Sequence, residues 1–322
     1  MTALQALILG IVQGICEFLP ISSSGHLVLL QRLFGINEGA LSFDIFVHLG
    51  TLVSLAVVMR KRLLGYLREP LGHIPKMVVL GTIPTVIIVL AFNSIFANLF
   101  DTGASLGVGF IFTALLLLFA ENHSKNESAS GRFAYSGGRS LTAGAQKRRF
   151  GYNERRRRTD MEQSVTPAGA LVVGIAQGIA VIPAVSRSGS TIAAGIMCDF
   201  GRPAAIEFAF LMSIPVTLMA VAQDLLKILI GNANAAKAAN AANAAIGDAS
   251  AAAANAAVSA AGAVDMAVGF IAAAITGYFA ARFMLRLIQK IKLTWFSIYV
   301  GLLGVFILAD QLFFGFVFDK LF

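Results

Sequence analysis

A polar stretch near the start of the chain, GICEFLPISSSGH, combines side chains that phosphoryl transfer uses. Glu17 is a carboxylate that can serve as acid, base or metal ligand, Ser23 offers a hydroxyl nucleophile, and the His26 imidazole can activate that hydroxyl or protonate a leaving oxygen. Ser23 and His26 are three residues apart, and Gln13 lies four before Glu17, so each pair shares a face on a helix. Glu17, Ser23 and His26 are therefore candidate catalytic residues. Gln13 is a candidate substrate-binding residue, with a hydrogen-bonding strut as the alternative.

A second polar segment, Ser186-Arg-Ser-Gly-Ser-Thr, offers a matching helix start and adds an arginine. Pro20 cannot continue a helix and the serines after it can cap a new one, so the first stretch predicts a helix, a break and a helix. Helix N-termini favour phosphate, and the Arg187 guanidinium can hold phosphate oxygens through two parallel hydrogen bonds. We therefore expect a diphosphate or phosphoryl-transfer site whose helix starts supply Ser22, Ser24, Gly25, Ser186, Ser188, Gly189, Ser190 and Thr191.

A divalent cation bound by Glu17 and the phosphates would spread the charge of the transition state. Structural alternatives exist for several of these residues. Ser22 and Ser24 could serve only to bond backbone groups, and Glu17 could form a structural salt bridge with Arg187. Such a bridge would still be expensive, because a charge inside a membrane costs about 2.5 to 3.5 kcal/mol on insertion scales.

Two other residues receive structural interpretations. His48 is expected to be a buried histidine without a role in the chemistry. Tyr299 is expected to face lipid or to anchor the helix at the membrane interface.

The elements that must position these groups are membrane helices. Of the 322 residues, 57% are hydrophobic and 13% charged, and the mean hydropathy is +0.78, which argues against a soluble globular domain. Runs of about 17 to 25 apolar residues can cross a bilayer as helices. The sequence predicts six spans, at 42–59, 77–98, 104–120, 204–224, 266–283 and 294–315. The net charge of +8 is concentrated between spans, which indicates membrane orientation, and we expect no nucleic-acid partner.

The basic loops predict the topology. Lys and Arg gather at 60–68, 147–158 and 282–292, so these loops are expected to be cytoplasmic. Segments 3–36 and 167–200 must then leave the membrane on the side they entered, as re-entrant helical hairpins. GIVQGI at Gly10 aligns without a gap to GIAQGI at Gly174, which predicts an inverted repeat.

The predicted fold is therefore an all-α polytopic membrane protein, an inverted-topology repeat with six transmembrane helices and two re-entrant hairpins. Residues 1–121 form the first repeat and residues 166–322 the second. Residues 122–165 are expected to be a basic, flexible cytoplasmic loop. The Ala/Asn-rich insertion at 232–264 is expected to be either a surface helix or disordered.

The two polar segments, read as Gln13-x-x-x-Glu17-x-x-Pro-Ile-Ser-Ser-Ser-Gly-His26 and Pro183-Ala-Val-Ser-Arg-Ser-Gly-Ser-Thr191, resemble the signature motifs of the bacitracin-resistance family of undecaprenyl-diphosphate phosphatases. The likeness extends to FDIFVHLG at Phe43 and covers most of the chain outside 122–165 and 228–264. Ala184 departs from the pattern, since the family commonly has glycine there.

The resemblance implies a multi-pass enzyme of the plasma membrane that removes the terminal phosphate of a polyprenyl diphosphate lipid, regenerating the carrier for cell-wall or surface-glycan assembly. It implies that Glu17 is the essential carboxylate, Ser23 the nucleophile, His26 its partner and Arg187 the phosphate clamp. It also implies a Mg²⁺ or Ca²⁺ cofactor and an active site towards the outer face.

A transporter or flippase of a polyprenyl phosphate or another anion is the alternative, because inverted repeats with re-entrant hairpins are a transporter architecture. The two halves differ, however, since Glu17 and His26 lie opposite Val181 and Ser190 in the alignment. This asymmetry favours an enzyme. The choice of Ser23 or His26 as nucleophile, the prenyl chain length and the formation of a homodimer stay open.

Overall fold

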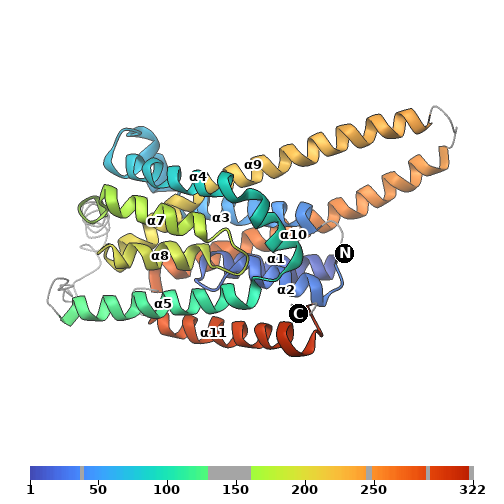
Figure 1. Ribbon diagram of the computed structural model, residues 1–322. Coiled ribbons are helices and arrows are strands. Elements are labelled where there is room, and N and C mark those ends of the chain that lie inside the picture. The colour runs from blue at the N-terminus through green and yellow to red at the C-terminus, as the bar shows by residue number, and fades with distance from the viewer. Residues whose placement is uncertain (37–39, 130–160, 244–248, 288–290, 319–322) are drawn as a thin grey trace, which may run out of the picture.

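The computed structural model describes residues 1–36, 40–129, 161–243, 249–287 and 291–318, and this part of the chain contains helices and no β-strand. Figure 1 shows a bundle of roughly aligned long helices with shorter helices among them. The elements are α1 (Ala3–Phe18), α2 (Ser23–Leu33), α3 (Ala40–Arg68), α4 (His73–Thr102), α5 (Leu106–Ala129), α7 (Pro167–Ile179), α8 (Arg187–Met197), α9 (Arg202–Asn243), α10 (Ala249–Leu287), α11 (Leu293–Ala309) and the π-helix η1 (Asp310–Phe314).

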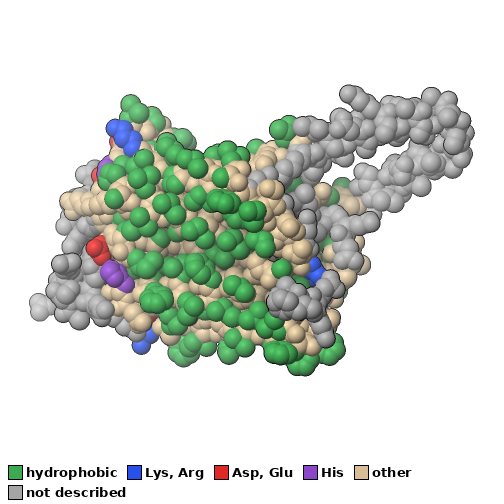
Figure 2. Space-filling view, viewed as in Figure 1, with side chains coloured by type: hydrophobic (Ala, Val, Ile, Leu, Met, Phe, Trp, Pro, Cys, Tyr) green, Lys and Arg blue, Asp and Glu red, His purple; other side chains and the backbone are tan. Residues whose placement is uncertain are grey.

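Among the described residues, six helices are long and apolar enough to cross a membrane, as predicted. Their hydrophobic side chains cover the viewed face in Figure 2, while Lys, Arg, Asp, Glu and His lie towards its ends. This distribution suits a surface in contact with lipid. Each predicted span overlaps one of the candidate segments, which are Ser42–Arg68, His73–Phe92, Leu106–Ser124, Arg202–Gln223, Gly262–Arg286 and Leu293–Phe314.

Two pairs of short helices, α1 with α2 and α7 with α8, occupy the polar segments. The longest of them, α1, has 16 residues, which at 1.5 Å per residue gives about 24 Å, short of the roughly 30 Å hydrocarbon core. In Figure 1 both pairs lie among the long helices. The pairs coincide closely with the predicted segments 3–36 and 167–200.

Glycines let these short helices approach the long ones closely. A Cβ on Gly10 of α1 would lie 2.5 Å from the carbonyl oxygen of Gly269 of α10. In the other pair, Gly174 of α7 lies against Gly81 of α4, and the Thr85 hydroxyl donates to the Gly174 carbonyl at 2.8 Å. Small residues at such crossings allow backbone-to-backbone packing in membranes. Helices α1 and α7 are thus each packed against a long helix from the other half of the chain.

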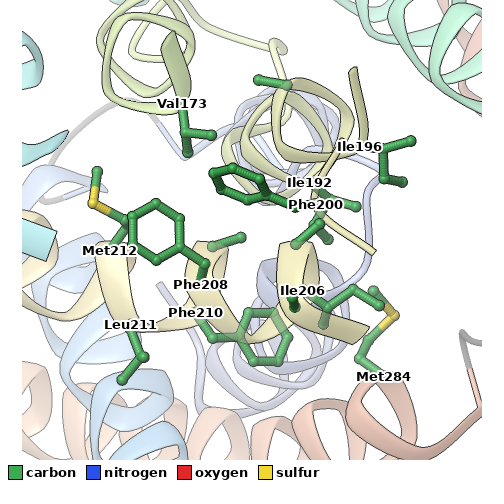
Figure 3. Packing of buried hydrophobic residues seen from close by; sticks show 14 of the residues in the cluster. Val173, Ile192, Ile196, Phe200, Ile206, Phe208, Phe210, Leu211, Met212 and Met284 are labelled. Atoms are coloured by element: carbon green, nitrogen blue, oxygen red, sulfur yellow. The ribbon is translucent and has the colours of Figure 1, made fainter. Parts of the chain in front are cut away.

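A hydrophobic cluster fixes α8 on α9. Figure 3 shows Ile192 and Ile196 of α8 beside Phe200, Ile206 and Phe208, which follow in the loop and in α9. The rings of Phe200 and Phe208 meet edge to face, with their centroids 5.7 Å apart. This packing holds the start of α8 in place.

Ion pairs tie the ends of long helices together. Arg62 of α3 lies 2.6 Å from Glu207 of α9. Glu121 of α5 accepts from Arg202 of α9 at 2.6 Å and from the Leu293 backbone N–H at 2.9 Å. These pairs connect α3, α5, α9 and α11 around the short helices.

Long helices continue into both predicted insertions. Helix α5 continues to Ala129, inside the predicted loop 122–165, and residues 130–160 lie outside the described residues. The Ala/Asn-rich tract is helical at 232–243 and 249–264, where it extends α9 and α10 beyond the bundle (Figure 1).

Candidate active site

The break between α1 and α2 forms as the sequence predicts. Helix α1 ends at Phe18, Pro20 lies in the turn, and Ser22 caps α2 by accepting the Gly25 N–H on its hydroxyl at 3.3 Å. Ser22 has φ of 68° and ψ of 96°, a conformation that residues with a side chain rarely adopt. The backbone between the two helices is therefore sharply bent and places Ser23 at the first position of α2.

The break between α7 and α8 is built in a similar way. The Ser186 hydroxyl caps α8 by accepting the Gly189 N–H at 3.0 Å, and Arg187 is the first residue of the helix. Ala184 lies in the left-handed region with φ of 65°, which explains why glycine suits this position. The Thr113 hydroxyl, on α5, accepts the Ser186 N–H at 3.0 Å and donates to the Ala184 carbonyl at 3.3 Å.

The two breaks lie against each other. The Ser188 hydroxyl donates to the Leu19 carbonyl at 2.9 Å. A Cβ on Gly25 would come within 2.9 Å of the Ala184 Cβ, so glycine is needed for this close approach. The starts of α2 and α8 are consequently neighbours, and the residues that cap them share one region of the bundle.

Glu17 is the centre of this region. Its Oε2 accepts the Ser23 hydroxyl at 2.7 Å and the Gln13 amide at 2.9 Å. Its Oε1 lies 3.9 Å from Arg187 Nη2, and the Glu17 side chain is only 11% exposed. A carboxylate that accepts a hydrogen bond from a serine hydroxyl is in position to remove the hydroxyl proton as a general base. The predicted residues Gln13, Glu17, Ser23 and Arg187 are therefore together.

His26 is placed differently from the sequence expectation. Its Nδ1 lies 2.6 Å from the Ser22 carbonyl and its Nε2 lies 2.8 Å from the Tyr299 hydroxyl. Both ring nitrogens thus have partners other than Ser23, whose hydroxyl turns back to Glu17 instead. Tyr299, expected to face lipid or the interface, is 47% exposed but joins α11 to α2 through this hydrogen bond.

The other predicted binding residues fall into three groups. The Gly25 and Gly189 N–H groups bind their capping serines, and the Thr191 hydroxyl donates to carbonyls of its own helix. By contrast, Gln13 Oε1 and Ser190 Oγ are buried without a hydrogen-bond partner among the described residues. The remaining serine hydroxyls pair within each cap at 3.4 Å, Ser22 with Ser24 at the start of α2 and Ser186 with Ser188 at the start of α8.

Two residues near the site were not predicted to belong to it: Thr217 was not singled out, and His48 received a structural interpretation. The Thr217 hydroxyl, on α9, accepts Arg187 Nη1 at 2.8 Å. His48 of α3 has its Nε2 3.9 Å from Glu17 Oε2. A lone threonine in an apolar span gives no signal, whereas His48 belongs to the FDIFVHLG segment that carries part of the family resemblance.

Comparison with known proteins identifies the family of this chain. Residues 6–306 match the family model described as bacitracin resistance protein BacA. The chain is 40% identical to the undecaprenyl-diphosphatase of Carboxydothermus hydrogenoformans, over 97% of this chain and 98% of the relative. It is 31% identical to the undecaprenyl-diphosphatase of Halothermothrix orenii, over 96% and 98%, and 30% identical to that of Campylobacter curvus, again over 96% and 98%.

The family match covers both polar segments, the first five candidate spans and the first part of the sixth, Leu293–Phe314. The chain therefore belongs to the bacitracin resistance protein BacA family.

Proposed function

We propose that this chain is a membrane phosphatase that hydrolyses undecaprenyl diphosphate to undecaprenyl phosphate and inorganic phosphate. Its relatives bear the name undecaprenyl-diphosphatase, and the monophosphate is the carrier form that cell-wall or surface-glycan assembly would reuse. The observation that carries the proposal is the 2.7 Å hydrogen bond from the Ser23 hydroxyl to Glu17, beside the Arg187 guanidinium.

The first step forms a bond between Ser23 Oγ and the terminal phosphorus. Glu17 Oε2 takes the hydroxyl proton as the attack proceeds. The bond between the terminal phosphorus and the bridging oxygen breaks, and the bridging oxygen leaves with the lipid as undecaprenyl phosphate. The terminal phosphoryl group remains on Ser23.

The second step releases phosphate. Water attacks the phosphorus of phospho-Ser23, and the proton held by Glu17 returns to Ser23 Oγ as the P–O bond breaks. Both protons of the water leave with the inorganic phosphate, as dihydrogen phosphate. The enzyme therefore ends the cycle with the hydrogen bond between Ser23 and Glu17 restored.

Arg187 is the residue expected to hold the phosphoryl oxygens. Its guanidinium is positioned by Thr217 on one side and lies 3.9 Å from Glu17 on the other, so it can turn from Glu17 to an incoming phosphate. The adjacent starts of α2 and α8 add the positive ends of two helix dipoles.

The residues present fit a magnesium or calcium ion that is shared with the substrate. Among the described residues, Gln13 Oε1 is buried without a partner and Glu17 Oε1 has only the distant Arg187, and hard cations prefer such oxygen ligands. Within the described residues no group of three or more His, Cys, Asp or Glu could hold an ion, so phosphate oxygens and water would complete the ligands. When bound, the cation would neutralise charge on the phosphates.

The architecture that we propose is an inverted repeat with re-entrant hairpins. Its support is the paired glycine crossings, in which Gly10 meets α10 and the equivalent Gly174 meets α4. Arg60, Lys61 and Arg68 lie in the C-terminal turns of α3, which we assign to the cytoplasmic side of the plasma membrane. The hairpin that carries Glu17 then enters from the outside, so the site opens towards the outer face.

Purified protein in detergent, supplied with undecaprenyl diphosphate, tests the proposal. We expect inorganic phosphate to be released, and Ser23→Ala to reduce release at least about a hundredfold, in line with the loss of covalent or acid–base catalysis. Ser213→Ala is the matched control, because this α9 hydroxyl donates to the Phe210 carbonyl of its own helix. Chelation should stop release, and Mg²⁺ or Ca²⁺ should restore it.

Two results would contradict this mechanism. Full activity of Ser23→Ala would exclude the serine as nucleophile. No phosphate release by the unmodified protein, combined with transfer of a polyprenyl phosphate across vesicles, would favour the transporter.

A further inference from the structure

Tyr299 and His26 form a pair that joins α11 to the start of α2. The Tyr299 hydroxyl lies 2.8 Å from His26 Nε2, and the two rings are nearly parallel, at 15°, with centroids 5.8 Å apart. A second ring, Phe110 from α5, meets the imidazole at nearly a right angle, 88°, with the ring centroids 5.5 Å apart. The imidazole is consequently in contact with aromatic rings from α5 and α11.

The hydrogen bonds define the protonation state of the neutral ring. The Ser22 carbonyl can only accept, so His26 Nδ1, 2.6 Å away, must carry a proton. Nε2 is then the acceptor, and the Tyr299 phenol is its donor. Removing that donor leaves the imidazole free to rotate away or to move its proton from Nδ1 to Nε2, and either change weakens the hold on Ser22.

The carbonyl that accepts from His26 belongs to Ser22, a residue with a positive φ angle. Ser22 is buried with φ of 68°, and its hydroxyl caps α2. Such a backbone conformation persists only when neighbouring contacts enforce it. The next residue is Ser23, so the direction of the Ser22 peptide determines whether the Ser23 hydroxyl reaches Glu17.

We propose that Tyr299 is a positioning residue that acts through His26 on the Ser22 backbone and so aligns Ser23 with Glu17. The pair does not accept the Ser23 proton and does not bind phosphate. This inference rests on the proposed phosphatase function, and it predicts that Tyr299 affects the turnover of bound substrate and leaves substrate affinity unchanged.

Tyr299→Phe is the decisive variant, because it removes the hydroxyl and keeps the ring that stacks on His26. We expect kcat for phosphate release to fall about tenfold, the size of one lost hydrogen bond, with KM changed less than about twofold. Tyr278→Phe is the matched control, since the Tyr278 hydroxyl on α10 is bound by Arg282. It should keep the kcat and KM of the unmodified protein.

A spectroscopic measurement reports on the pair without any substrate. In protein labelled with ¹⁵N-histidine, the His26 signal, assigned by its loss in His26→Asn, should show a protonated Nδ1 and an unprotonated, hydrogen-bonded Nε2. Tyr299→Phe should shift the Nε2 signal, and Tyr278→Phe should not.

Unchanged kcat in Tyr299→Phe, or a change confined to KM, would overturn the proposal. So would an Nε2 signal that Tyr299→Phe leaves in place. If the unmodified protein releases no phosphate, the proposed function fails, and the nitrogen signals alone then decide whether Tyr299 holds His26.

Discussion

The hydrogen bond between Arg187 and Thr217 gives a direct test of how the guanidinium is positioned. Thr217 is 5% exposed, and its hydroxyl accepts Arg187 Nη1 at 2.8 Å. Thr217→Val keeps almost the same shape but removes the acceptor, so one guanidinium N–H loses its partner. We expect Arg187 to sample orientations that no longer face the phosphate.

The size of the effect follows from the charge of the donor. A hydrogen bond to a charged group contributes about 1.5 to 3 kcal/mol. If this bond orients Arg187 in the transition state, kcat/KM falls about 10- to 150-fold, because about 1.4 kcal/mol corresponds to a factor of ten. The lower end is expected, since the Arg187 side chain is 27% exposed and water can replace the lost acceptor.

Phosphate release from undecaprenyl diphosphate in detergent measures this effect. Thr217→Ser retains the hydroxyl and should stay within about threefold of the unmodified protein, well short of the loss expected from one missing charged hydrogen bond. Thr82→Val is the matched control, because the Thr82 hydroxyl donates to the Val78 carbonyl of its own helix. Unaltered kcat/KM in Thr217→Val, or equal losses in Thr217→Val and Thr217→Ser, would refute the reasoning.

Three further predictions concern the base, the bent backbone and the helix crossings. Glu17→Gln should lower phosphate release about a hundredfold or more while the protein still folds, because the amide cannot take a proton; comparable rates would exclude Glu17 as the base. Ala184→Gly should change the free energy of unfolding by less than about 1 kcal/mol, because relief of about 1 kcal/mol of strain offsets about 0.8 kcal/mol of lost burial. Ala184→Val should cost about 2 kcal/mol or more, and thermal unfolding that ranks the two variants the other way would contradict this. Gly10→Ala should lower the midpoint of thermal unfolding, since its Cβ would meet the Gly269 carbonyl. Gly65→Ala is the control and should not lower it, because its Cβ meets open space. Equal midpoints for the two variants would argue against the crossing.

The membrane spans could be predicted because length and hydropathy alone decide whether a helix can cross a bilayer. The helix breaks could be predicted because proline and capping serines act locally, and Ser22 and Ser186 do cap α2 and α8. The pairing of Gln13 with Glu17 followed from their spacing on α1.

The environment of His26 could not be predicted from spacing. The rule that residues three apart share a face assumes that both side chains lie along the same helix. Ser23 is the first helical residue, however, and its side chain turns to α1, while His26 turns to Tyr299 on α11. Tyr299 and Thr217 reach the site from helices far away in the sequence, and neither is marked by a motif.

The two glycine crossings have a consequence for how the protein is made. Helix α1 is synthesised long before its partner α10, with α2 to α9 between them, whereas α7 finds its partner α4 already made. The nascent chain must therefore keep the short helix α1 without its final neighbour until α10 has been translated. Premature termination before α10 would leave that helix unsupported, which makes truncated chains natural targets for membrane quality control.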